Sequence, residues 1–178
     1  MDLDGKMRAI REILLEHSPN PSVRTDSSIL IVYPPEEEND FREHLHKLLD
    51  LLVARGVAFR HVDLATLPFE VLEARGLTPE VFQQEFDDFP AVRRGLARAI
   101  QDALKERIAQ VAAEVPGGPA ILSATSALYP LVKFSDLLAE LRPVPCRIVV
   151  AFPGLEEGGK LRFMNQRDGY NYLAVKIN

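Results

Sequence analysis

The sequence predicts a three-layer α/β fold, a mostly parallel sheet with helices on both faces. Two observations support this prediction. Residues 28–33 (SILIVY) form a short, continuous apolar run, which is typical of a strand buried on both faces within a parallel sheet. Short runs of this kind then alternate along the chain with longer segments of helical periodicity, as they do in consecutive βαβ units.

The chain of 178 residues is long enough to build its own hydrophobic core, so we expect residues 1–178 to form a single α/β domain. Apolar residues recur at helical spacing within 6–17, and residues 18–28 are rich in Pro, Asn and Ser, which favour loops. We therefore expect residues 1–27 to form an N-terminal helix and loop that are attached loosely to the rest.

The first βαβ unit is expected at residues 28–63. Two prolines end the strand at 28–33, and a helix with leucines on one face follows as far as Gly56, a residue that commonly terminates helices. Residues 58–63 (AFRHVD) alternate in polarity as a second strand should. A right-handed connection between parallel strands is therefore predicted.

The remaining elements are predicted from the same signals. Residues 64–115 are helical in pattern, with Thr66 and Gly76 at the ends of a short helix and a long helix over 92–111. Further strands are predicted at residues 120–123 (AILS), 147–152 (RIVVAF) and 170–177, with one or two helical turns at 134–141.

The composition argues against several classes of protein. The net charge of −5 argues against direct nucleic-acid binding, because general nucleic-acid binders are normally basic. The single cysteine, Cys146, excludes a disulfide framework and heads an apolar run, so it is predicted to be a core residue. No apolar stretch approaches the ~20 residues of a transmembrane helix, and the start of the chain is too charged for a secretory signal. A cytoplasmic protein without membrane contact is expected.

Residues 154–160 (GLEEGGK) match the first seven positions of a phosphate-binding loop, and an apolar strand precedes them. Leu161 stands where such a loop needs Ser or Thr to bind Mg²⁺, and the two glutamates would repel phosphate. We interpret the segment as a Gly-rich loop between two extended segments. The fold is then Rossmann-like, or like a P-loop nucleoside triphosphatase without a functional phosphate loop.

The edge at which the parallel strands end is a candidate ligand rim, because open α/β sheets bind ligands there. His61 and Asp63 lie on the same side of a strand and could form a general-base pair, but a hydrogen-bonded structural histidine is the favoured interpretation. Thr125 or Ser126 could contribute to an anion site, but capping of a helix is the favoured interpretation. No metal site and no cofactor are predicted. The residues of the candidate rim are Tyr33, His61, Asp63, Ser123, Thr125, Ser126 and Gly154.

The segment 158–172 has three cations and one acid on an otherwise acidic chain. Leu161 and Phe163 share one face of an extended segment, so we expect them to anchor it to the sheet. Because Arg and Tyr dominate protein interfaces, an interaction surface is one interpretation; an edge strand protected by its charges is the other. The residues of the candidate surface are Lys160, Arg162, Asn165, Arg167, Asp168, Tyr170, Asn171 and Tyr172.

Three short motifs follow one another near the end of the chain: FPG at 152–154, LRFM at 161–164 and DGYNYLA at 168–174. With the apolar strand before them, they resemble the end of the BrxB-like proteins of bacteriophage exclusion (BREX) defence systems. The segment 120–141 is also similar to the strand, Pro-containing turn and Leu-rich helix of that family. The chain resembles a divergent or short member.

The resemblance implies a non-catalytic assembly or adaptor component that contacts a larger defence protein, with an alkaline-phosphatase-like PglZ protein as the expected partner. The residues agree, since the sequence has no G-x-S-x-G elbow and no cysteine beside a base. The alternative is a small enzyme, or a nucleotide- or anion-binding module, that uses the strand-end rim. A third and weaker alternative is nucleic-acid contact through Arg93, Arg94, Arg98 and the tail.

Overall fold

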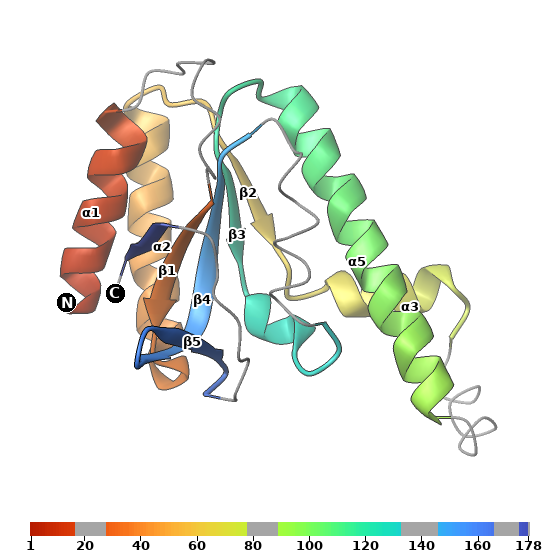
Figure 1. Ribbon diagram of the computed structural model, residues 1–178. Helices are drawn as coiled ribbons and strands as arrows, with labels where there is room; N and C mark the ends of the chain where they lie inside the picture. The colour runs from red at the N-terminus through yellow and green to blue at the C-terminus, as the bar shows by residue number, and fades with distance from the viewer. Residues whose placement is uncertain (17–27, 78–88, 133–145, 166–174, 178) are drawn as a thin grey trace.

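The structure, a computed structural model, describes residues 1–16, 28–77, 89–132, 146–165 and 175–177. The described elements form a six-stranded sheet with helices on both sides (Figure 1). The strand order is β2-β3-β4-β1-β6, and β5 pairs with β4 off this path. All pairs are parallel except β4–β5, which is antiparallel. The predicted three-layer, mostly parallel α/β fold is confirmed.

The element bounds agree with most of the ranges predicted from the sequence. The predicted strand at 120–123 is confirmed residue for residue, and the final strand is confirmed over the part of 170–177 that the structure describes. The predicted helical turns at 134–141 lie outside the described residues. The strands are β1 (Ile29–Tyr33), β2 (Arg60–Asp63), β3 (Ala120–Ser123), β4 (Ile148–Glu157), β5 (Lys160–Phe163) and β6 (Val175–Ile177). The helices are α1 (Leu3–Glu16), α2 (Glu38–Ala54), α3 (Leu67–Ala74) and α5 (Phe89–Glu114), with 3-10 helices η1 (Pro35–Glu37) and η3 (Thr125–Leu128).

Each face of the sheet has its own hydrophobic core. Helices α1 and α2 cover one face, and α3 and α5 cover the other (Figure 1). Strand β1 contributes to both cores, because Ile29 and Ile31 point to the α1–α2 side and Leu30 and Val32 to the other. This position in the middle of the sheet explains why the run at 28–33 has no polar alternation.

Helix α1 packs on α2 and on the adjoining strands through Met7, Ile10 and Leu14, which are buried. These are the apolar positions from which the helix was predicted. Lys6 is also buried on this helix, and its Nζ donates a hydrogen bond to the carbonyl oxygen of Val32, 2.7 Å away. The loop expected at 18–28 lies outside the described residues except for Ser28, which is buried.

On the opposite face, α3 is joined to α5 by an ion pair in which Arg107 Nη2 lies 2.6 Å from Glu70 Oε2. Thr66 stands before α3 as predicted, but its hydroxyl donates to Glu70 Oε1 instead of capping the backbone. Cys146 is buried, as predicted, and its burial raises the pKa of its thiol. Within the described residues, no helix is long and apolar enough to cross a membrane.

Candidate functional site

Strand β4 does not stop at the edge of the sheet. Its pairing with β1 ends where Tyr33 lies opposite Pro153, but the strand continues to Glu157 and returns as β5. Only Gly158 and Gly159 form the turn, and both have the positive φ angles, 59° and 76°, that a two-residue hairpin turn requires. The Gly-rich loop expected at 154–160 is therefore shorter than predicted, since its first four residues belong to an antiparallel ladder.

Gly154 allows the two strands of this hairpin to approach each other. A Cβ atom at this position would lie 2.1 Å from the carbonyl oxygen of Arg162, which is far inside contact distance. Gly154 pairs with Phe163 at the base of the hairpin. This candidate rim residue thus has a structural role, because its lack of a side chain permits the antiparallel pairing.

The inner face of the hairpin is anchored in the core. Leu161 is fully buried and Phe163 is 5% exposed, and both belong to the cluster on the α3–α5 side of the sheet. The ring of Phe163 meets Phe152 edge to face with centroids 5.2 Å apart, and it lies 6.4 Å from the ring of Tyr129. The predicted anchoring by Leu161 and Phe163 is confirmed.

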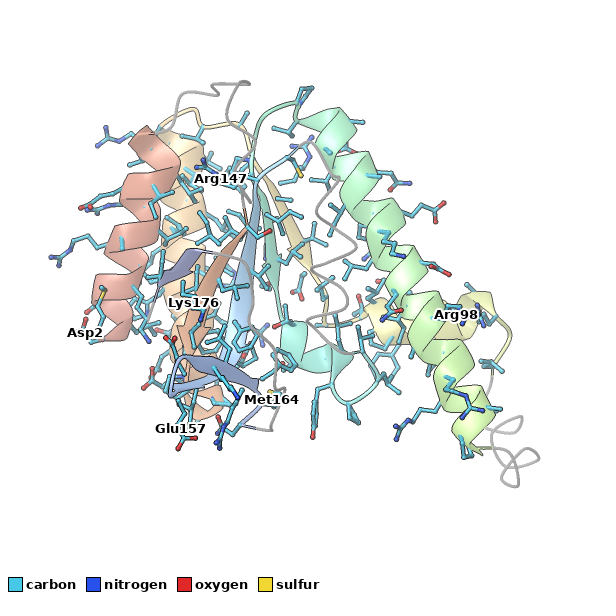
Figure 2. The ribbon with its side chains drawn as sticks, in the orientation of Figure 1. Asp2, Arg98, Arg147, Glu157, Met164 and Lys176 are labelled. Atoms are coloured by element: carbon cyan, nitrogen blue, oxygen red, sulfur yellow. The ribbon has the colours of Figure 1, made fainter. Side chains whose placement is uncertain are left out.

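The opposite face of the hairpin points away from this core. Leu155 lies opposite Arg162 and Glu157 opposite Lys160 in the register, so these four side chains share one face, which we call the hairpin outer face. Leu155 is 45% exposed, Lys160 is exposed, and Arg162 forms an ion pair with Glu157. Glu157 lies at the end of the hairpin in Figure 2.

The charges on both sides of the hairpin are partly neutralised within the chain. On the inner side, Glu156 Oε1 lies 3.3 Å from Lys176 Nζ of β6, while Arg162 pairs with Glu157 on the outer side. Sequence reasoning did not find Leu155 as a surface residue. The Gly158–Gly159 pair, a typical two-residue hairpin turn, was the available signal, but the whole of 154–160 was interpreted as a loop.

The remaining residues of the candidate surface lie at or beyond the end of β5. Asn165 is exposed and follows Met164; both residues have positive φ angles, 59° and 50°, which end the strand. The other members, Arg167, Asp168, Tyr170, Asn171 and Tyr172, lie outside the described residues.

At the carboxyl end of β1, the candidate rim is filled by contacts within the chain. Tyr33 is fully buried, its hydroxyl donates to Glu38 Oε2 at 2.6 Å, and its ring stacks on Phe41 with centroids 4.1 Å apart. Burial, and then the Glu38 carboxylate, raise the pKa of Tyr33 far above its usual range. Desolvation lowers the pKa of Lys6, which binds the preceding carbonyl of β1. Sequence reasoning missed Lys6.

At the ends of β2 and β3, the structure brings two rim residues together. His61 Nε2 and Ser123 Oγ are hydrogen-bonded at 2.7 Å, and Ser123 is buried. Desolvation lowers the pKa of His61, although the nearby Asp63 opposes the shift, so the ring favours its neutral form. Asp63 Oδ1 accepts a hydrogen bond from the backbone N–H of Ala65, which closes a local turn.

The expected capping by Thr125 or Ser126 is wrong. Thr125 is fully buried, and its hydroxyl donates to the carbonyl oxygen of Ala151 in β4 at 2.5 Å. No side chain caps η3, and the residue before it, Ala124, has a left-handed φ of 52°. Thr125 faces a strand carbonyl because the chain turns inward at Ala124, so its hydroxyl ties η3 to the sheet.

An open depression of about 490 Å³ lies beside the start of β2, and most of the strand-end rim does not line it. Val53, Val57, Phe59 and Val115 are among the residues that line it, and of the candidate rim only His61 takes part. Within the part of the chain that the structure describes, no group of three His, Cys, Asp or Glu side chains could hold a metal ion.

The comparisons with known proteins identify the family. The family model described as BREX protein BrxB matches residues 60–177, which is more than half of the chain and includes β2 to β6 with the whole hairpin. No curated protein and no solved structure matches the chain. The chain therefore belongs to the BrxB family and is a component of a BREX phage-defence system.

Proposed function

We propose that this chain is a non-catalytic assembly or adaptor component that binds a larger protein of its defence system through the hairpin outer face. One observation carries the proposal: β4 leaves the sheet and presents Leu155 beside Lys160 and Arg162. Protein interfaces combine an apolar centre with a polar rim and are enriched in arginine, and the hairpin outer face places an exposed leucine beside an arginine. The proposal also assigns contacts with the partner to the tail residues, which lie outside the described residues: Arg167, Asp168, Tyr170, Asn171 and Tyr172.

The anchoring of the hairpin supports this function. Leu161 and Phe163 hold its inner face in the core, and Gly154 lets the two strands pair closely. A recognition element that is already ordered loses less conformational entropy when it binds. The hairpin outer face is thus suited to act as a rigid contact, while the binding energy comes from its side chains.

The contacts at the rim also support a role without catalysis. Tyr33, Thr125 and Asp63 each have a side-chain oxygen in a hydrogen bond within the chain. The proposed partner is an alkaline-phosphatase-like PglZ protein in the cytoplasm, and direct nucleic-acid binding is not part of the proposal.

The test measures the affinity of the purified chain for the purified PglZ-like protein of the same system. Leu155→Asp is the most direct variant, because Leu155 is exposed and its replacement leaves the inner face intact. We expect it to weaken binding about tenfold or more, as loss of a central interface residue does. Val53→Asp is the matched control, since Val53 is 68% exposed on α2 and lies outside the proposed surface.

Arg162 needs a different design because it already pairs with Glu157. A single charge reversal would disturb the hairpin as well as the interface. The double variant Glu157→Arg/Arg162→Glu exchanges the two charges and keeps an ion pair within the hairpin. Weaker binding by this variant would therefore reflect lost contacts with the partner and not damage to the hairpin. No binding of the natural chain at micromolar concentration, or equal binding by Leu155→Asp and Val53→Asp, contradicts the proposal.

The second candidate function is a small enzyme or a nucleotide- or anion-binding module at the strand-end rim. The hydrogen bond between His61 and Ser123 is the observation that favours it, since a neutral imidazole beside a hydroxyl can accept its proton. A ligand that binds the native state raises the melting temperature by mass action. Nucleotides and phosphate esters at millimolar concentration should therefore raise it, and less so in Ser123→Ala. An absence of any shift excludes this candidate for the ligands tested.

A further inference from the structure

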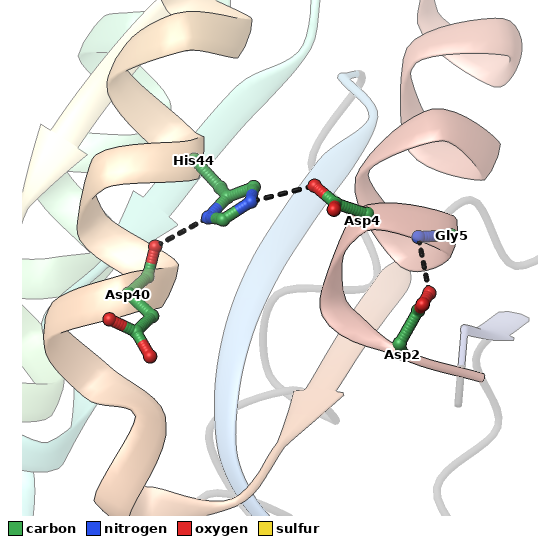
Figure 3. Close-up of polar contacts among 5 residues, drawn as sticks. All are labelled: Asp2, Asp4, Gly5, Asp40 and His44. Carbon is green, nitrogen blue, oxygen red and sulfur yellow. Dashed lines mark hydrogen bonds and ion pairs between the residues drawn. The ribbon is translucent and has the colours of Figure 1, made fainter.

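His44 connects helices α1 and α2. Its Nδ1 lies 2.8 Å from the carbonyl oxygen of Asp40, one turn earlier on α2, and its Nε2 lies 2.8 Å from Asp4 Oδ1 on α1 (Figure 3). The two contacts use both nitrogens of one ring, and the second joins residues 40 positions apart in the sequence. This side chain therefore lies at the polar margin of the contact between the two helices.

The chemistry of the two neighbours favours the protonated form of the ring. A carbonyl oxygen and a carboxylate only accept hydrogen bonds, and a neutral imidazole has a single N–H to donate. Only the imidazolium ion donates to both at once. We propose that His44 is a protonated link between α1 and α2, so that the docking of α1 on the rest of the protein is coupled to pH.

The charged groups around His44 agree with this assignment. The Asp40 carbonyl has the largest influence and raises the pKa of His44; partial burial lowers it, the Asp4 carboxylate raises it, and Lys47 on α2 lowers it. Asp2 lies on the same end of α1, but its Oδ1 accepts from the backbone N–H of Gly5 at 2.9 Å (Figure 3).

The sign of the pH effect follows from the Asp4 carboxylate, because the Asp40 carbonyl belongs to α2 and stays beside His44 when α1 undocks. In the docked state this carboxylate makes His44 bind its proton more tightly than in the undocked state. The stabilisation is complete below the pKa of the undocked state and is lost as pH rises through the pKa of the docked state. Because Met7, Ile10 and Leu14 stay buried and Lys6 keeps its bond to Val32, α1 is expected to loosen and not to detach.

The size of the effect is small, because His44 and Asp4 are both accessible to water. We expect the protection of α1 amides against hydrogen exchange to fall about two- to fivefold from the acidic to the alkaline side of the titration. Protection in α5, on the opposite face of the sheet, should stay constant over the same range. This inference does not depend on the proposed adaptor function, because it concerns a helix that makes no contribution to the hairpin outer face.

The first test follows the rings of the four histidines by NMR as pH is varied. The variant Asp4→Asn removes the carboxylate from His44 and should lower its titration midpoint. Asp2→Asn is the matched control, since it also removes one negative charge from the start of α1, while Asn keeps the cap on Gly5. His46 is an internal reference, because its Nδ1 also lies 2.8 Å from a carbonyl one turn earlier, that of Arg42.

The second test compares hydrogen exchange in the natural chain and in His44→Gln between about pH 5.5 and 8, the range in which histidine titrates. After correction for the intrinsic exchange rate, protection of α1 should depend on pH in the natural chain and not in His44→Gln. The proposal is overturned if both proteins show the same pH dependence. It is also overturned if Asp4→Asn moves the His44 midpoint no further than Asp2→Asn does.

Discussion

The neighbouring strands β1 and β4 end differently at the same edge of the sheet. Strand β1 ends at Tyr33, whose ring is stacked on Phe41 and whose hydroxyl is bound to Glu38. Strand β4 passes Pro153, the register partner of Tyr33, and continues to Glu157 as one arm of a hairpin. The first end is closed by the chain itself, and the second presents Leu155 and charged side chains to the solvent.

The comparison shows why a polar residue at a strand end is weak evidence for a ligand site. Tyr33, Lys6 and Thr125 all lie where an open α/β sheet binds ligands, but each uses its polar atoms within the protein. A surface for a partner needs side chains whose interactions are not already used inside the fold. The hairpin outer face meets this condition best at Leu155.

The largest expected effect tests the anchoring of the hairpin. Phe163→Ala removes a buried ring that packs on Phe152, so we expect unfolding to become easier by about 3–5 kcal/mol. Urea denaturation measures this change, and Lys160→Ala on the opposite face should stay within about 0.5 kcal/mol of the natural chain. A similar, small effect of both variants would mean that the hairpin is not fixed to the core. The description of β4 as one arm of an anchored hairpin, in contrast to the closed end of β1, would then be wrong.

The second effect tests the close approach of the two hairpin strands. Gly154→Ala places a Cβ atom against the carbonyl of Arg162, so a destabilisation of about 1–3 kcal/mol is expected from overpacking. Gly95→Ala on α5 is the matched control, because a Cβ atom added there would meet nothing within 4 Å and alanine favours helices. The two variants should shift the denaturation midpoint in opposite directions; a shift in the same direction would contradict the geometry.

A smaller effect is expected at the closed end of β1. Tyr33→Phe keeps the stacked ring and removes only the hydroxyl that binds Glu38, which should cost about 1 kcal/mol. Thermal unfolding at neutral pH measures it. An unchanged melting temperature would indicate that this hydrogen bond contributes nothing, and that Tyr33 is held by stacking and burial alone.

The smallest effect is expected on the hairpin outer face. Glu157→Gln breaks the ion pair with Arg162, which is accessible to water, and should cost about 0.5 kcal/mol or less. The difference from the natural chain should shrink further in high salt, since salt screens exposed charges. A loss as large as that of Phe163→Ala would show that the outer face is needed for folding, and it would remove the distinction between the two faces of the hairpin.

Patterns over a few residues were enough to predict much of this protein. The unbroken apolar run at 28–33 predicted a strand buried on both faces, and the alternation of Leu161 and Phe163 predicted the anchored side of the hairpin. The motifs at the end of the chain indicated the family that the comparison then showed. The two structural features depend on how apolar side chains are spaced along a single strand, and this spacing can be read directly from the sequence.

Only the tertiary structure decided which partners the polar groups take. The bonds of Lys6 to Val32, Thr125 to Ala151, and His44 to Asp4 join residues 26, 26 and 40 positions apart. The extension of β4 beyond the sheet likewise depends on its pairing with β5, because backbone groups at 154–157 need the opposite strand to form hydrogen bonds. A sequence shows which polar groups need hydrogen-bond partners, but the fold alone determines which groups lie close enough to form those hydrogen bonds.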